Sequence, residues 1–202
     1  MKTAAGQNTG FRSCVFVFLS VIFLVAPAAA ETFPFYVYND ANAPENHFIP
    51  SGWMGDWGDL TVKADHADNC HGGATCLQII YTGLQAQGAK WAGVYWQDPP
   101  NNWGSKPGGF DLRGAKKLTF WARGEKGGEV IDEFRAGGIP GEYFDSDVAY
   151  SPAVTLTTEW QHYEISLEGR DLESIKGGFM WAAKLQDNKN GVTFYLDEIR
   201  YE

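Results

Sequence analysis

Short apolar stretches separated by glycine, proline and asparagine most constrain the fold of this 202-residue chain. Beyond residue 30, apolar residues do not follow the 3.6-residue period of a helix, except for about one turn near residues 169–177. About nine strands without helices are typical of two antiparallel sheets packed face to face. The sequence therefore predicts one all-β sandwich domain over residues 31–202. Its expected strands lie at 35–39, 59–65, 76–82, 91–97, 116–124, 129–137, 154–167, 177–185 and 191–202.

Alternation along two of these strands separates core positions from surface positions. In 116–124, Leu118, Phe120 and Ala122 share one face, which we expect to lie in the core. In the last strand neither face is purely apolar, because Asp197 interrupts it. A buried acid is costly unless charge or hydrogen bonds compensate it, so Asp197 needs a partner.

Residues 1–30 have the three parts of a secretory signal peptide. Lys2 and Arg12 supply positive charge, an apolar run of residues 14–26 follows, and small residues end the segment at Ala30. The alternative, an uncleaved membrane anchor, is disfavoured by the short apolar run and by the small residues after it. We therefore expect cleavage after Ala30. The expected mature protein is secreted or periplasmic, has no membrane segment and is a monomer.

Charge excludes one class of partner. The chain has 16 basic and 25 acidic residues, a net charge of -9. Removing Lys2 and Arg12 leaves 14 basic residues against 25 acidic ones, a net charge of -11. Such a surface repels phosphate backbones, so no nucleic-acid partner is expected, whereas a hard cation could be held.

Cys70 and Cys76 are the two cysteines of the expected mature chain. Export places them in an oxidising compartment, where so close a pair is expected to form a disulfide. Closing this short loop stabilises the fold by about 2 kcal/mol in the chain-entropy treatment. A metal site that includes His71 is the alternative, but it lacks the usual spacing of four ligands.

Three segments carry a resemblance to a known family. They are FDLRGAKKLTFWARGEKGGE, LTTEWQHYEISLEGRDLESIKGGFMW and VTFYLDEIRYE, which together with the strands between them cover most of residues 31–202. Their pattern resembles that of galactose-binding-like jelly-roll domains, especially family 11-type carbohydrate-binding modules. This resemblance implies a jelly-roll β-sandwich with a concave face that binds polysaccharide. It specifies a ligand poorly, because one fold serves many functions.

The same resemblance implies a structural Ca²⁺ away from that face. In the family, the acid of the terminal strand is commonly a calcium ligand, together with an acid or amide near the first strand. The matching positions here are Asp197 and either Asn39 or Asp40. Oxygen ligands of this kind are those that calcium prefers.

Aromatic residues at 91–103 indicate where a ligand would bind. If 91–97 is a regular strand, Trp91, Gly93, Tyr95 and Gln97 share one face, while Val94 and Trp96 point to the core. Flat rings beside amides and carboxylates suit sugars, although the same rings could instead fill an edge of the sandwich. We predict one exposed groove lined by Trp91, Tyr95, Gln97, Asp98, Asn102, Trp103 and Arg135.

Catalytic motifs give little support to an enzyme. Glycosidases need two carboxylates facing each other across a cleft, and the sequence has no recognisable hydrolase motif. AGVYWQ and Gln161–His162 resemble strands of jelly-roll alginate lyases, but their order is reversed and the arginine-rich strand is missing. We interpret that match as accidental. The histidines, His47, His66, His71 and His162, are scattered without metal-ligand spacing.

The expected function is that of a secreted, non-catalytic protein whose partner is a polysaccharide or oligosaccharide. A small secreted polysaccharide-degrading enzyme, either a lyase or a glycoside hydrolase, is the first alternative. A structural or envelope domain without a glycan ligand is the second. The enzyme requires a pair of pKa-tuned groups in the groove, whereas a binding protein requires only aromatic and amide side chains.

Overall fold

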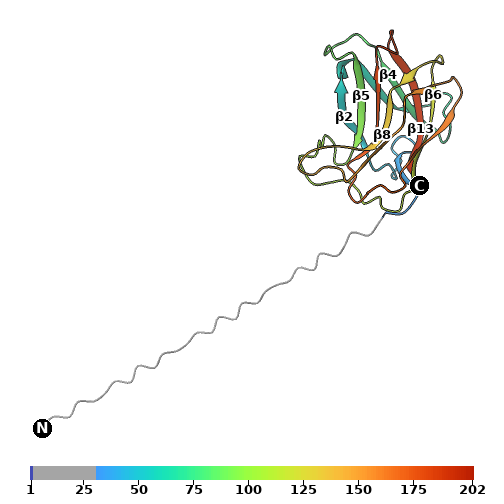
Figure 1. Cartoon of the computed structure of the whole chain (residues 1–202). Coiled ribbons are helices and arrows are strands. Elements are labelled where there is room, and N and C mark those ends of the chain that lie inside the picture. Colours follow the sequence, from blue (N-terminus) through green and yellow to red (C-terminus); the bar gives the residue numbers. More distant parts are fainter. Residues whose placement is uncertain (2–30) are drawn as a thin grey trace.

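The computed structural model describes Met1 and residues 31–202 (Figure 1). The predicted signal peptide lies outside the described residues, apart from Met1. Strands form two antiparallel sheets that face each other, as the sequence predicts. In the described part, the only helix is a single 3-10 turn, Trp57–Asp59, and the turn of helix expected near 169–177 is absent. No helix among these residues is long and apolar enough to cross a membrane.

One sheet has five strands in the order β2-β5-β12-β8-β9. Their bounds are Ile49–Gly55, Trp91–Gln97, Gly177–Lys184, Glu133–Gly137 and Val148–Tyr150. The sequence did not predict β2 or β9. Both lie at sheet edges, and β9 has only three residues, too few to show an alternating pattern.

The other sheet has six strands. Five run in the order β11-β6-β13-β4-β3, and β1 pairs with the C-terminal half of β13. Their bounds are Gln161–Ser166, Lys117–Gly124, Val192–Tyr201, Cys76–Tyr81, Leu60–His66 and, for β1, Phe35–Tyr38. A two-stranded ribbon of β7, Val130–Ile131, and β10, Val154–Thr155, lies beside the sandwich.

The core lies between the two sheets. Leu118, Phe120 and Ala122 of β6 are buried, which confirms the predicted alternation. Phe120 packs against two rings of the facing sheet, Phe134 of β8 and Phe179 of β12, at centroid distances of 4.6 and 5.3 Å. Burial of such rings supplies the main driving force for pairing the sheets.

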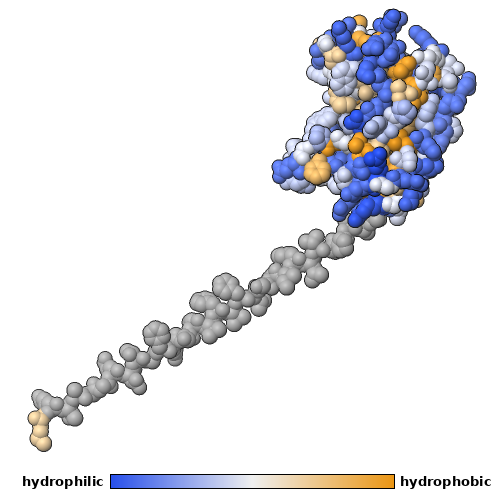
Figure 2. Space-filling model, in the orientation of Figure 1, coloured by the Kyte–Doolittle hydropathy of each residue, from blue (hydrophilic) through white to orange (hydrophobic). Residues whose placement is uncertain are grey.

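Loops project beyond one end of the five-stranded sheet, below β2 and β5 in Figure 1. The space-filling view shows the molecule indented above these loops, with apolar residues among polar ones in the indentation (Figure 2). The outer face of the five-stranded sheet is therefore open to solvent and bordered by loops at this end.

Candidate functional site

A row of side chains crosses four strands on the outer face of the five-stranded sheet. In β5, Val94 and Trp96 are buried in the core, as predicted, so the alternate residues of this strand face outward. The strand pairing extends the row from β5 to β9. Tyr95 lies opposite Met180, Met180 opposite Arg135, and Arg135 opposite Tyr150.

The floor of this face is apolar and shallow. Tyr95, Met180 and Ile139 form a buried cluster, separate from the main core, against which Met54 and Ala182 pack. Gly93, the outward residue between Trp91 and Tyr95, adds no side chain. A Cβ there would lie 2.5 Å from the Trp181 carbonyl oxygen, so the backbone packing requires glycine.

Charged groups on this face are paired with each other. Arg135 forms an ion pair with Glu133 on the same strand, and Lys184 Nζ lies 2.6 Å from Asp132 Oδ1. Arg135 also donates a 3.3 Å hydrogen bond to Tyr95 Oη, which itself donates to the Gly137 carbonyl at 3.1 Å. Burial raises the pKa of Tyr95, although Arg135 opposes this shift. Tyr95 is therefore a neutral hydroxyl fixed in place.

Exposed aromatic rings stand around the apolar floor. Trp103 is 41% exposed and lies edge-on to Tyr95, with ring centroids 5.9 Å apart. Tyr150 is 64% exposed at the far side of the row. Trp91, half-buried at the other end of β5, lines an open pocket of about 460 Å³ together with Lys90, Lys184 and neighbouring loop residues.

The structure thus places Trp91, Tyr95, Trp103 and Arg135 on one face. Tyr95 is only 4% exposed, however, so its ring is not the exposed groove wall that the sequence predicted, because Ile139, Met180 and the Trp103 ring pack against it. Tyr150 was missed. The alternation of Val148, Ala149 and Tyr150 is the only signal that could have revealed it, because buried Ala149 leaves its two neighbours on the outer side.

Gln97 and Asn102 do not offer the accessible polar groups that the sequence predicted, since both side chains are 0% exposed. Gln97 is hydrogen-bonded to Ser51 Oγ at 3.0 Å and to the Asn102 carbonyl at 3.2 Å. Asn102 binds the backbone of Lys106 through both ends of its amide. These amides hold the loop that carries Trp103. Asp98, half-buried, accepts a 3.1 Å hydrogen bond from Gly109 N at the other end of that loop.

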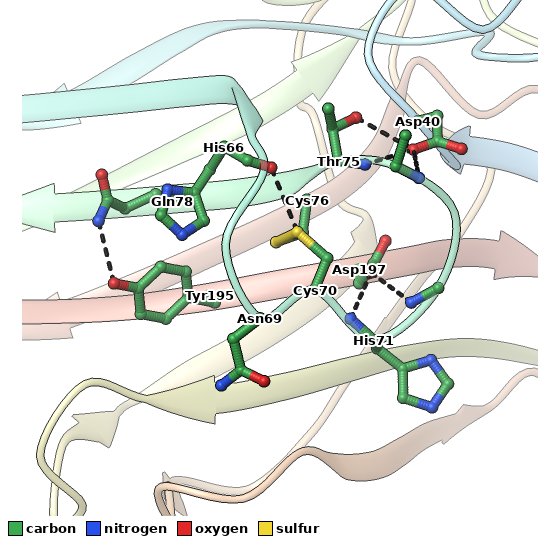
Figure 3. Close-up of a disulfide and its surroundings, with 12 residues drawn as sticks. Asp40, His66, Asn69, Cys70, His71, Thr75, Cys76, Gln78, Tyr195 and Asp197 are labelled. Carbon is green, nitrogen blue, oxygen red and sulfur yellow. Dashed lines mark hydrogen bonds between the residues drawn. A yellow bond between two sulfur atoms is a disulfide. The ribbon is translucent and has the colours of Figure 1, made fainter.

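The predicted disulfide between Cys70 and Cys76 is confirmed. It closes a loop that lies on the six-stranded sheet (Figure 3), where His71 of the loop stacks on Trp121 of β6. Asp197 Oδ2 accepts hydrogen bonds from the N–H groups of His71 and Gly72, and Oδ1 accepts one from Glu198 N. Buried Asp197 therefore does have partners, and they are backbone amides of this loop and its own strand.

Asp40 holds the same loop from the first strand's side. Its Oδ1 accepts hydrogen bonds from Ala74 N at 2.9 Å and from Thr75 N at 2.7 Å. These bonds outweigh burial and lower the pKa of Asp40, whereas burial raises the pKa of Asp197 to about 6. Asn39 donates to Glu45.

This arrangement does not fit a metal centre as it stands. Both oxygens of Asp197 and one oxygen of Asp40 already accept backbone hydrogen bonds. Within residues 31–202, no group of three or more His, Cys, Asp and Glu side chains is placed to hold a metal ion. Calcium binding by Asn39, Asp40 and Asp197 stays a prediction.

Comparison with known proteins places the fold. No family model and no curated protein matches the sequence. Among solved structures, a family 30 carbohydrate-binding module matches with a TM-score of 0.55 and 18% identity, over 84% of this chain and 87% of that one. The family 30 module of a cellulosomal cellulase of Clostridium thermocellum matches with a TM-score of 0.52 and 18% identity, over 85% and 98%.

A family 11 module from the same organism, also part of a cellulosomal cellulase, has a TM-score of 0.50 and 13% identity, over 86% of this chain and 94% of that one. At such identities the likeness establishes the fold. The chain has the jelly-roll β-sandwich fold of carbohydrate-binding modules, which confirms both the predicted fold class and the resemblance found in the sequence.

Proposed function

We propose that this chain is a secreted or periplasmic protein that binds a neutral polysaccharide or oligosaccharide without cleaving it. The ligand would lie across the outer face of the five-stranded sheet. The observation that carries this proposal is the row Tyr95, Met180, Arg135 and Tyr150, flanked by Trp91 and Trp103. Exposed rings around a shallow apolar floor suit the C–H faces of sugar rings, and the guanidinium of Arg135, held by Glu133, suits their hydroxyls.

Charge pairing supports a neutral ligand. Lys90, beside Trp91, forms no ion pair within residues 31–202, but Arg135 and Lys184 are each already neutralised by a carboxylate, Glu133 or Asp132. An acidic sugar would have to compete with these carboxylates for the same cations. A neutral sugar needs only the hydrogen bonds that such pairs still offer.

The arrangement of titratable groups favours binding over catalysis. The carboxylates of Glu133 and Asp132 are engaged by cations, whereas a glycosidase needs two carboxyl groups free to act on opposite sides of the bond. A lyase of the kind considered above needs a tyrosine and a histidine together. Tyr95 faces outward from one sheet, and His162 lies on β11 of the other sheet beside Trp121.

Affinity electrophoresis in hydroxyethylcellulose, xyloglucan and galactomannan tests this proposal. We expect the parent protein to be retarded by at least one of these polymers. Tyr150→Ala and Trp103→Ala should each weaken retention by about tenfold, because an interfacial ring typically contributes 1–2 kcal/mol. Tyr36→Ala, which removes a ring from β1 of the other sheet, is the matched control and should bind as the parent does.

Each alternative function has its own outcome. New reducing or unsaturated ends after incubation would show an enzyme. Neither retention nor cleavage on any polymer would favour a structural domain. N-terminal sequencing of the protein exported by its own host tests secretion, since a mature chain should begin at Glu31.

A further inference from the structure

Three of the four histidines, scattered in the sequence, meet on the outer face of the six-stranded sheet. His71 stacks on Trp121, with centroids 3.6 Å apart, and His162 lies 5.1 Å from the same indole. His66 lies 5.0 Å from Tyr195, beside it in Figure 3. This face is opposite the proposed glycan-binding face, so a ligand bound here would occupy a second, independent site.

Arg123 of β6 lies among these rings, and the burial of its charged guanidinium is unusual. The side chain is only 7% exposed. Its guanidinium carbon lies 3.7 Å from the centroid of Tyr195 and 5.3 Å from that of Trp160. Such contacts stabilise a cation in part, but they do not replace hydrogen bonds.

Two of the three guanidinium nitrogens are poorly satisfied by hydrogen bonds within the protein. Nε is buried without a hydrogen-bond partner in the described part of the chain, and Nη1 donates only a long, 3.4 Å bond to the Gly124 carbonyl. Nor does Arg123 form an ion pair with any residue in 31–202. A buried charge is normally paired and hydrogen-bonded, so an unpaired one calls for an anion.

Acids on the same face are already engaged. Glu125 Oε2 accepts a 2.6 Å hydrogen bond from Tyr195 Oη. Glu198 lies 3.3 Å from His71 Nδ1, and Glu164 lies 3.7 Å from Lys117 Nζ. None of these carboxylates forms an ion pair with Arg123.

The disulfide loop fixes the rings around the guanidinium. Trp160 donates from Nε1 to the Asn69 carbonyl at 2.9 Å, while Asp197 holds the N–H of His71 at 3.0 Å. Asn69 and His71 project from the same side of this loop in Figure 3. The indole of Trp160 is therefore held in place beside Arg123, and the imidazole of His162 is exposed on the same face. Both rings could contact a ligand whose anionic group pairs with Arg123.

We propose that the outer face of the six-stranded sheet binds a sugar that bears a carboxylate, a uronic acid residue. Arg123 pairs with the carboxylate, and Trp160 and His162 contact the ring. This site goes beyond the proposed neutral-glycan site and uses none of its residues. The net charge of -9 works against non-specific adsorption to polyanions, so retention on one would indicate a local site.

Affinity electrophoresis of the full chain in polygalacturonate at low ionic strength tests this proposal. The parent protein should be retarded, and Arg123→Met should weaken retention by about tenfold or more, because a charge-assisted hydrogen bond is lost. The same variant should melt at an unchanged or higher temperature, since it removes an uncompensated buried charge. A purely structural arginine would instead lower the melting temperature and leave retention unchanged.

Two further variants keep the test decisive. Lys63→Met removes an exposed cation three strands away on the same face and should retain the parent's affinity. Glu125→Gln removes the negative charge beside Tyr195 and should strengthen retention about threefold, even where Arg123→Met fails to fold.

Three results would overturn the proposal: no retention of the folded parent protein, unchanged retention of Arg123→Met, or equal losses for Arg123→Met and Lys63→Met. Tyr150→Ala should leave retention on polygalacturonate unchanged. A parent protein that binds polygalacturonate but no neutral polymer would therefore refute the proposed function and support this second site.

Discussion

Asp56 anchors the segment that leads into Trp91, and replacing it tests how this end of the aromatic face is held. The carboxylate is 0% exposed. Burial alone would raise its pKa, yet hydrogen bonds outweigh burial and lower it below the ordinary value of 3.8. Four donors surround its oxygens at 2.8–3.1 Å: the N–H groups of Gln87, Ala89 and Lys90 and the hydroxyl of Tyr81.

Asp56→Asn converts one acceptor oxygen into an NH₂ group. At least one backbone N–H then faces another donor, and the remaining bonds lose their charge assistance. Hydrogen bonds to charged groups contribute about 1.5–3 kcal/mol each, so we expect the free energy of unfolding to fall by about 2–4 kcal/mol. Urea denaturation followed by tryptophan fluorescence measures this as a lower midpoint with an unchanged m-value.

Asp59→Asn is the matched control. Asp59 is also buried and lies three residues away, but its carboxylate accepts one hydrogen bond, from Ala86 N at 3.2 Å. Its replacement should cost about 1 kcal/mol. Equal losses in the two variants would refute the argument, because the number of bonds to Asp56 would then not matter.

Acid titration gives the second measurement on Asp56. Because its folded pKa lies below 3.8, its stabilising contribution is present above that pH and is lost as the pH falls through the folded pKa. The difference in unfolding free energy between the parent protein and Asp56→Asn should therefore shrink in acid. A constant difference would contradict the lowered pKa.

Further predictions concern loops around both faces. Burial raises the pKa of Asp145, although three backbone hydrogen bonds oppose this shift. Its contribution to stability is therefore present at low pH and is lost as the pH rises through its folded pKa. Urea denaturation at a series of pH values should show that Asp145→Asn lacks this loss. Replacing Cys70 and Cys76 by serine should lower the free energy of unfolding by about 2 kcal/mol, read by urea denaturation against the oxidised parent. Asn102→Ala should lower it by about 1–3 kcal/mol and weaken retention on the neutral polymer, because the Trp103 loop loses two anchoring bonds. If calcium binds near Asp197, chelator should lower the melting temperature and added calcium should restore it; identical curves and no metal in elemental analysis would end that prediction.

Strand alternation predicted the core because it depends only on neighbours in sequence. The inward residues of β6 and β5 were identified from their period of two, and the same period placed Trp91 and Tyr95 together on the outer face. Arg135 lies on the same face as Trp91 and Tyr95 because its strand, β8, pairs with β12. No local sequence pattern predicts this pairing.

What alternation could not predict is how loops cover a face. Gln97 has the outward position that its strand gives it, yet the loop after β5 folds back over it and takes up its amide. A polar side chain at an outward position can equally well face water or satisfy a buried backbone carbonyl, and sequence period does not distinguish the two. For the same reason Asp197 was recognised as an acid in need of a partner, while the backbone amides that bind it come from a loop more than a hundred residues earlier.

The outer faces of the two sheets both arise from strand alternation, yet they differ in how their charged groups are paired. On the five-stranded sheet, Arg135 is neutralised by Glu133 of its own strand, and Lys184 by Asp132, the residue that directly precedes that strand. On the six-stranded sheet, the disulfide loop brings the Asn69 carbonyl to Trp160 and the imidazole of His71 to Trp121, but it brings no carboxylate to Arg123. Because the cost of an unpaired guanidinium grows with its burial, the 7% exposure of Arg123 increases the stabilisation that an anion would provide there. We therefore expect the partners of each charged group, rather than the period of the strands, to account for the difference between the two proposed ligands.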